Sequence, residues 1–516
     1  MRTILTILLF VCCFVTQATN KYVAKTGNDS NAGTSSLPCL TINHGITLLT
    51  PGDTCFVKVG TYQEYVHFFS SGTVGHPIVL KNYGTDVVTI DAQSTRVYCL
   101  YAADQSYITI DGINILNSTA YNLNFVGCNN VILKNMVSTA PVNSVTYGFE
   151  VTGDSNWADH FTLQNLTAVG GGYCIWLTGK VSNTTVTNCE VSQAKYTGLE
   201  INVDNVTIPS GPQLLVRPRS IVVDGVYSHN NTIQGISMRI AQNITVRNSH
   251  SAYNGATGIQ IEAYTDTVLV ENNICEFGSR SYTYETGIWL YLSNHATIRK
   301  NILRNNQTGL RVSGGSSSFQ IYYNLIYNNN YSPGGTNQST SGVDFSNAHG
   351  TFYDNTLYGN CASNSQLAGL YFYPDTSTVD LKNNIIMNSG GAKDMTFLQM
   401  PASIVTSDYN IVYNANRATS ILVGSTSYSW SGYKIASSQD VHSVNSDPLF
   451  EDSSNTDFKL LTGSPAVNAG VNVGLTTDYL GNLIKSSPDI GAYEQYIIYH
   501  YSSQGHWASF TNKYLY

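Results

Sequence analysis

The chain has 516 residues, only 11% of them charged, and its formal net charge is −8 at pH 7. With 25 Lys and Arg against 33 Asp and Glu it lacks the basic surface that nucleic acid requires, so we predict no nucleic-acid partner. Its length would allow several domains, but the internal repeat described below favours one long domain that grows by stacking.

Residues 1–18 are predicted to be a secretory signal peptide. Arg2 supplies the positive charge, residues 4–15 supply an apolar core, and residues 16–18 form a cleavage site. The apolar run is too short to span a membrane, so we expect a protein that is secreted or displayed at the cell surface, without a transmembrane segment. Export permits disulfides, and Cys39 and Cys55 are candidates for a bridge because they flank a predicted helix.

One short strand pattern recurs nine times between residues 147 and 374. Each copy has a small residue, then an apolar residue, then a second apolar residue two positions further on. Strict alternation predicts a strand with one buried face, and recurrence every 22 to 37 residues predicts one such strand per coil of a solenoid. The copies lie at 147–153, 173–179, 197–203, 234–240, 257–263, 286–292, 308–314, 341–347 and 368–374.

A second pattern, which ends in Asn, falls between these copies. It occurs as VILKN at 131–135, ITVRN at 244–248 and VLVEN at 268–272, for example. Asn suits a turn whose backbone leaves the β region, and stacked Asn side chains would form an amide ladder along the solenoid. Two or three short strands per coil predict a parallel β-helix, whereas a β-propeller would need hairpins and a period of about 40 to 50 residues.

The outward-facing positions of the recurring strand hold the candidate functional residues. Neighbouring coils stack ~4.8 Å apart and alternate strand positions lie ~6.8 Å apart, which places Arg239 between the levels of Glu200 and Glu262. A sheet that carries aromatic rings, carboxylates and an arginine resembles a polysaccharide-binding face. The alternative is a solvated sheet whose aromatic residues reflect strand propensity. The predicted substrate-binding residues are Glu150, Trp176, Gln260, Trp289, Tyr291, Arg311, Asp344 and Tyr371.

The catalytic candidates on this face are Glu200, Arg239 and Glu262. A lyase that works by β-elimination needs a base and a cation, and Arg239 is the candidate base. A glycosidase needs two carboxylates, which Glu200 could form with Glu150 or Glu262. Calcium is a candidate cofactor, since residues 154–159 (DSNWAD) form either a weak calcium loop or an ordinary Asx turn.

The N-terminal segment 21–62 carries a family resemblance. Its phrase GNDSNAGT at 27–34, followed by PGDT at 51–54 and GTY at 60–62, resembles the N-terminal cap of secreted right-handed parallel β-helix proteins, including the family 9 polysaccharide lyases. The resemblance implies an all-β, single-stranded right-handed parallel β-helix with an N-terminal helical cap, formed here by residues 41–49. It also implies lyase activity, although the lysine base and calcium-binding aspartates of that family have no counterpart on the outward face.

The C-terminal segment carries a second resemblance. SDPLF at 446–450, FKLLTGSPAVNAG at 458–470 and PDIGAYE at 488–494 are similar to the choice-of-anchor type Q domain, a small β module that often ends secreted bacterial β-helix proteins. We expect this module to cover the exposed edge of the last coil. The predicted organisation is a signal peptide at 1–18, a cap and first coils at 19–105, the β-helix at 106–445, the C-terminal module at 446–496 and a tail at 497–516.

These observations predict a monomeric extracellular protein that binds polysaccharide and degrades a uronate-containing polysaccharide by β-elimination. Two alternatives stay open: a non-catalytic surface or adhesive protein, and an inverting glycoside hydrolase with paired glutamates. Insertions at 204–220 and 328–341 interrupt the coil rhythm and are expected to form walls beside the binding face.

Overall fold

The computed structural model describes residues 18–203, 216–278, 285–330, 340–361, 367–390, 393–398, 405–501 and 507–511. The predicted signal peptide, apart from Ala18, and most of both insertions therefore lie outside the described residues. Among the described residues, no helix is long and apolar enough to cross a membrane.

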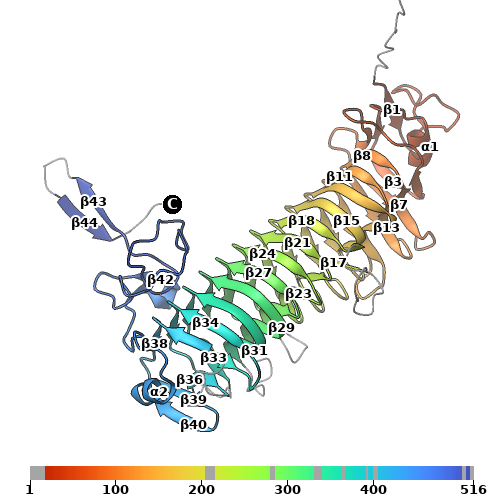
Figure 1. Cartoon of the computed structure of the whole chain (residues 1–516). Coiled ribbons are helices and arrows are strands. Elements are labelled where there is room, and N and C mark those ends of the chain that lie inside the picture. The colour runs from red at the N-terminus through yellow and green to blue at the C-terminus, as the bar shows by residue number, and fades with distance from the viewer. Residues whose placement is uncertain are drawn as a thin grey trace, which may run out of the picture.

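The chain winds into a long solenoid of parallel strands, which form a 26-stranded and a 14-stranded sheet (Figure 1). The 26-stranded sheet covers two sides of each coil, which we call the first and second sheets, and the 14-stranded sheet is the third. This confirms the predicted parallel β-helix with two or three strands per coil. The first sheet contains the recurring strand of the sequence, the second contains the strand that ends in Asn, and the third closes the coil. Four long strands, β13, β15, β29 and β31, bend from the first sheet into the second.

The strands of the first sheet are β4 (Val66–Phe68), β7 (Tyr98–Ala103), β10 (Tyr121–Val126), β13 (Tyr147–Gln164), β15 (Ile175–Thr187), β17 (Leu199–Asn202), β20 (Ile236–Arg239), β23 (Thr257–Glu262), β26 (Thr286–Tyr291), β29 (Thr308–Tyr322), β31 (Ser341–Tyr353), β33 (Ala368–Phe372), β36 (Lys393–Phe397) and β39 (Ser420–Val423). The second sheet adds β1 (Asn20–Val23), β2 (Thr54–Val57), β5 (Ile78–Asn82), β8 (Ser106–Asp111), β11 (Asn129–Lys134), β18 (Arg219–Asp224), β21 (Gln242–Arg247), β24 (Asp266–Glu271), β27 (Asn294–Arg299), β34 (Thr378–Lys382) and β37 (Val405–Asp408). The third sheet consists of β3 (Gly60–Tyr62), β6 (Val88–Asp91), β9 (Ile113–Leu116), β12 (Val137–Thr139), β14 (Thr167–Val169), β16 (Glu190–Ser192), β19 (Tyr227–His229), β22 (His250–Ala252), β25 (Ile274–Glu276), β28 (Ile302–Arg304), β30 (Leu325–Tyr327), β32 (Thr356–Tyr358), β35 (Ile385–Met387) and β38 (Ile411–Tyr413).

The inward positions of the recurring strand form the core, as the alternation predicts. Phe149, Ile175 and Leu199 and their counterparts along the solenoid are fully buried. The small residue that precedes them approaches the next coil closely, because a Cβ atom added to Gly287 would lie 2.6 Å from the carbonyl oxygen of Gly309. A larger residue in this row would therefore push neighbouring coils apart.

Asparagine side chains form a buried ladder where the second sheet ends. Each strand-closing Asn, such as Asn272, has a positive φ, which confirms the predicted turn. In the later coils the ladder itself consists of the next residue in each turn. From Asn301 onward, the side-chain oxygen of each ladder Asn accepts bonds from the backbone N–H and the side-chain amide of the Asn one coil earlier. Its members are Asn273, Asn301, Asn324, Asn355, Asn384 and Asn410.

Helix α1 (Ile42–Thr47) closes the N-terminal end of the solenoid, as expected of the cap (Figure 1). Thr41 accepts a bond from the His44 backbone N–H through its hydroxyl and so caps the helix. Ile42 and Ile46 are buried in the core, and the Glu64 carboxylate accepts the backbone N–H of Ile42. These contacts cover the apolar edge of the first coil.

The C-terminal end differs from the expectation that residues 446–496 cover the last coil. That end is closed by β40 (Thr426–Ser429) and helix α2 (Trp430–Ser437), whose Tyr433 is buried and stacks on Phe397. The C-terminal module, with β41 (Phe450–Asp452), the 3-10 helix Ser453–Asn455 and β42 (Asp457–Leu460), instead packs on the third sheet, beside the solenoid (Figure 1). The reason is that Tyr327 and Ile385 of the third sheet form an apolar face, which Phe458 and other residues of the module cover. A hairpin of β43 (Ile497–Tyr501) and β44 (Trp507–Thr511) follows.

The expected bridge between Cys39 and Cys55 is not formed in this structure. All eight described cysteines are free and buried. Burial raises the pKa of the Cys275 thiol, as expected for a small core residue rather than a reactive group. We predict that a chain without residues 1–18, unfolded without reductant, titrates eight thiols with Ellman's reagent; a titre of six would show that the bridge forms.

Candidate functional site

The outward row of the first sheet is aligned as the sequence predicts. Glu150 pairs with Trp176, Trp176 with Glu200, and Glu200 with Ser237. The row continues in register through Gln260, Trp289, Arg311, Asp344 and Tyr371. In the second row, Arg239 pairs with Glu262 and Glu262 with Tyr291. The predicted site residues therefore form two adjacent rows on one face.

The first of these rows is much less exposed than a solvated sheet. Glu200 is 6% exposed, Gln260 5% and Asp344 1%, whereas Ile132 on the outer face of the second sheet is 40% exposed. The side chains on neighbouring coils contact and hydrogen-bond one another, which removes them from water. The second row is more open, since the side chain of Arg239 is 46% exposed. The face is therefore a buried polar row bordered by an exposed one.

Glu200 is the most perturbed group on this face. Burial, together with the charge of Glu262, raises its pKa from the ordinary 4.5 to about 7, against hydrogen bonds from Ser237, Thr197 and Asn202 that lower it. The Asn202 amide donates to the Glu200 carboxylate at 3.0 Å. Glu200 therefore keeps its proton at pH values up to about 7. The sequence offered no signal for Thr197 and Asn202, because their role depends on packing between coils.

Glu262 stands in a different environment from Glu200. Burial raises its pKa, but the Arg239 guanidinium and a hydrogen bond from Gln260 act in the opposite direction. The nearest Arg239 nitrogen lies 3.9 Å from Glu262, and the Gln260 amide donates to it at 2.6 Å. Gln234 in turn donates to Gln260 at 2.8 Å and fixes its orientation. We name Glu200, Glu262 and Arg239 the carboxylate cluster: two buried carboxyls with raised pKa values, of which Glu262 has a cation beside it.

The remaining predicted binding residues form a second group farther along the solenoid. Arg311 makes a bidentate ion pair with Asp344, with distances of 2.7 and 2.9 Å, and its guanidinium lies 5.9 Å from the ring centroid of Trp289. Tyr291 packs edge-on to Trp289, and Tyr371 is 8% exposed. Arg311 and Asp344 thus satisfy each other, so this group offers chiefly the aromatic surface of Trp289 and Tyr291 to a ligand.

Glu150 and Trp176 lie on the other side of the carboxylate cluster. Glu150 accepts hydrogen bonds from Asn124 at 3.0 Å and Thr152 at 2.8 Å. Trp176 donates through Nε1 to Asn202 at 2.8 Å, and Asn202 is the residue that holds Glu200. Trp176 therefore connects the aromatic part of the face to the candidate acid.

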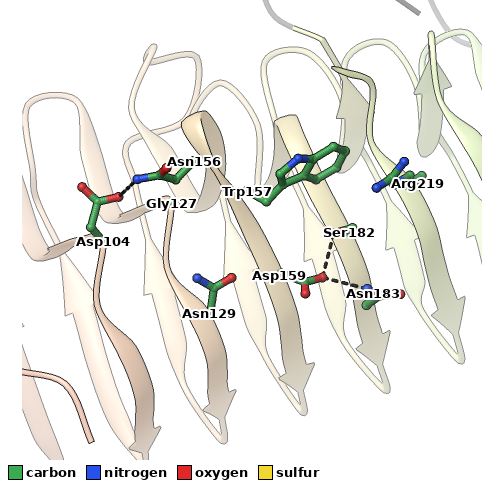
Figure 2. A pocket seen from close by; sticks show the side chains of 9 residues that line it. All are labelled: Asp104, Gly127, Asn129, Asn156, Trp157, Asp159, Ser182, Asn183 and Arg219. Atoms are coloured by element: carbon green, nitrogen blue, oxygen red, sulfur yellow. Dashed lines mark hydrogen bonds between the residues drawn. The ribbon is translucent and has the colours of Figure 1, made fainter. Parts of the chain in front are cut away.

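A polar pocket of about 500 Å³ lies beside this face, at the corner between the first and second sheets (Figure 2). Its lining residues are Asp104, Gly127, Asn129, Asn156, Trp157, Asp159, Ser182, Asn183 and Arg219. The predicted calcium loop falls here, but its side chains do not converge: Asn156 donates to Asp104, while Asp159 accepts from Ser182 and Asn183. Within the described residues no group of three or more His, Cys, Asp or Glu could hold a metal ion. The polar side chains of this pocket thus form hydrogen bonds between coils of the solenoid.

A family model for the right-handed β-helix region matches residues 147–349 and 281–439, together more than half of the chain. The chain belongs to the right-handed β-helix family. The matched region of this β-helix includes both rows of the candidate site and the whole carboxylate cluster.

Two curated relatives match most of this β-helix. The uncharacterized protein YwoF of Bacillus subtilis is 23% identical over 464 residues, which cover 86% of this chain and 91% of YwoF. Lacto-N-biosidase of Bifidobacterium longum subsp. longum is 21% identical over 93% of this chain, but the match spans only 36% of that enzyme.

Solved structures with a similar fold include several proteins that act on carbohydrates. XylC, solved in complex with xylose, aligns with 92% of this chain and 98% of its own at a TM-score of 0.45 and 12% identity. Pectate lyase Pel9A aligns with 93% of this chain and 97% of its own at a TM-score of 0.34 and 15% identity. These similarities concern the fold.

Proposed function

We propose that this β-helix is an extracellular glycoside hydrolase whose general acid is Glu200 and whose second carboxylate is Glu262. The observation that carries the proposal is the contrast between the two carboxyls. Burial raises the pKa of both carboxyls, that of Glu200 to about 7, but only Glu262 has a cation, Arg239, that acts against the rise. A carboxyl with a raised pKa close to a second carboxyl in different surroundings is typical of acid–base catalysis on glycosidic bonds.

In the proposed reaction, Glu200 gives its proton to the glycosidic oxygen as the bond from that oxygen to the anomeric carbon breaks. A water molecule attacks the anomeric carbon and transfers a proton to Glu262, which conserves charge over the step. The two residues lie two coils apart and on adjacent rows, so their Cα atoms are separated by about 12 Å. Side chains that extend toward each other fit the inverting arrangement, in which the carboxyls are about 6.5–9.5 Å apart.

We favour hydrolysis over the β-elimination that the N-terminal resemblance implies. Elimination would use Arg239 as a base, yet a guanidinium stays charged in proteins and this one forms an ion pair with Glu262. The name of one relative, lacto-N-biosidase, also denotes a glycosidase. The predicted signal peptide at 1–18 and the resemblance to a choice-of-anchor domain support action outside the cell, on a polysaccharide partner.

The test uses the mature chain on xylan, glucomannan and mixed-linkage β-glucan, with polygalacturonate and alginate as uronate substrates. We expect new reducing ends on at least one neutral polysaccharide, without a rise in absorbance at 235 nm and without dependence on added calcium. A rise at 235 nm on a uronate substrate would instead establish the lyase. Silence in both assays on all five polymers would contradict hydrolysis and favour the non-catalytic binding protein.

A further inference from the structure

Six tyrosines form a continuous row along the edge where first-sheet strands begin, on successive coils of the N-terminal half. Neighbouring ring centroids lie 5.9, 5.5, 5.3, 5.7 and 5.5 Å apart. Each of the six side chains is half-buried. We name this row the tyrosine ladder; its members are Tyr65, Tyr98, Tyr121, Tyr147, Tyr173 and Tyr196.

The ladder ends at the candidate catalytic centre. Trp176 packs against Tyr147 at 4.8 Å and Tyr173 at 5.0 Å, and it donates to Asn202, the residue that hydrogen-bonds Glu200. On the coils after Tyr196 the residues before the repeat glycines are polar rather than aromatic: Gln234, Thr257, Thr286 and Thr308. The tyrosine ladder is thus confined to one side of the carboxylate cluster, which it reaches through Trp176.

The charge beside the ladder restricts the kind of ligand. The first-sheet strands from β4 to β17, all of them described, contain no Lys or Arg in their first-sheet portions, whereas Glu150 and Glu200 both lie there. Lys195 lies near the end of the ladder, 5.3 Å from the ring centroid of Tyr196. Glu150 and Glu200 make these strands acidic rather than basic, which disfavours a polyuronate. Hydroxyl groups can donate hydrogen bonds to carboxyl oxygens, so this stretch is compatible with an uncharged glycan.

We propose that the tyrosine ladder binds an extended, uncharged glycan parallel to the solenoid axis, with about one sugar unit per coil. The coil spacing of ~4.8 Å is close to the length of one sugar unit in an extended chain. Partly exposed rings supply rigid surface that is apolar with a polar end, which suits the mixed character of a sugar. The proposal rests on the proposed function only in one respect: the end of the bound glycan that lies beside Glu200 is the end to be cleaved.

The test is affinity electrophoresis of the Glu200→Gln protein in gels that contain xylan, glucomannan, mixed-linkage β-glucan or polygalacturonate. We expect retardation by at least one neutral polysaccharide and none by polygalacturonate. In that background, Tyr98→Ala with Tyr121→Ala should weaken binding about tenfold or more. Tyr227→Ala, on the third sheet and 37% exposed, is the matched control and should bind normally.

A second measurement does not require the variant with Tyr98→Ala and Tyr121→Ala to fold. In the protein with its tyrosines intact, the retarding polysaccharide should protect Tyr98 and Tyr121 from acetylation by N-acetylimidazole, while Tyr227 stays reactive. Retardation by polygalacturonate, equal reactivity with and without glycan, or no retardation by any neutral polysaccharide would each overturn the proposal. Binding without release of reducing ends by the unsubstituted protein would refute the hydrolase and leave the ladder in place.

Discussion

Replacing Glu200 with Gln is expected to lower kcat on the neutral polysaccharide by roughly 10³-fold, within the usual range for loss of a general acid. Gln keeps the size of the side chain and can still bond Asn202, but it has no proton to transfer to the leaving oxygen. Reducing-end assays at saturating substrate measure the effect. Glu190→Gln, on the third sheet, is the matched control and should keep full activity.

The same residue sets the expected pH dependence. Activity of the unsubstituted protein should fall as the pH rises through about 7, because Glu200 then loses the proton it must donate. An activity that stays flat from pH 6 to 9, or a Glu200→Gln variant with more than about a tenth of normal kcat, would contradict the assignment.

The pH dependence of folding stability tests the raised pKa of Glu200 without any substrate. Its folded-state pKa of about 7 lies above the ordinary 4.5, so unfolding releases a proton between these values and stability falls as pH rises from 4.5 to 7. Above pH 7 the full cost is about 3 kcal/mol. Glu200→Gln removes this cost, so the variant should match the unsubstituted protein at pH 4 and melt at a higher temperature at pH 8. A lower melting temperature at pH 8 would show that the carboxylate is stabilising when ionised.

Asn324→Ala is expected to destabilise the protein by about 3–5 kcal/mol, the largest single effect on folding that we predict. The fully buried Asn324 accepts bonds from the backbone N–H and the amide of Asn301, at 3.1 and 3.0 Å, and donates to Asn355 and the Ile298 carbonyl. Alanine would leave several of these groups buried without partners. Thermal or denaturant unfolding measures the change.

Asn416→Ala is the control for Asn324→Ala, because Asn416 is exposed and lies outside the asparagine ladder. It should change stability by no more than about 0.5 kcal/mol. If Asn324→Ala proved as mild as Asn416→Ala, the ladder would have to recruit water or relax between coils, and the uniform hydrogen bonding along the solenoid would not be the main stabilising feature.

The repeat explains how far sequence reasoning could reach in the candidate site. Alternation at Gly148, Phe149 and Val151, repeated over nine copies, specifies which positions point inward and aligns the outward rows coil by coil. Register follows because a shift by one residue would expose every apolar side chain. The juxtaposition of Glu200, Arg239 and Glu262 was therefore predictable without coordinates.

The surroundings of those side chains were not predictable in the same way. Nothing in the sequence pattern indicates that Glu200 is buried or that Thr197 and Asn202 bond it. The position of the C-terminal module was also not predictable, since residues 446–496 were expected to cover the last coil but pack on the third sheet. Such contacts join residues far apart in the chain, and they depend on which surfaces the finished solenoid leaves apolar.

The sequence by itself determined the coil, its core rows and the Asn turns, because each of these repeats locally and is set by backbone geometry and alternation. Only the tertiary structure decided which outward residues are buried, and therefore that the pKa of Glu200 is raised. It also decided that six tyrosines from separate coils form one ladder that ends beside Glu200. The physical reason is that burial and stacking depend on contacts between coils, which the residue spacing within the sequence of one coil does not reveal.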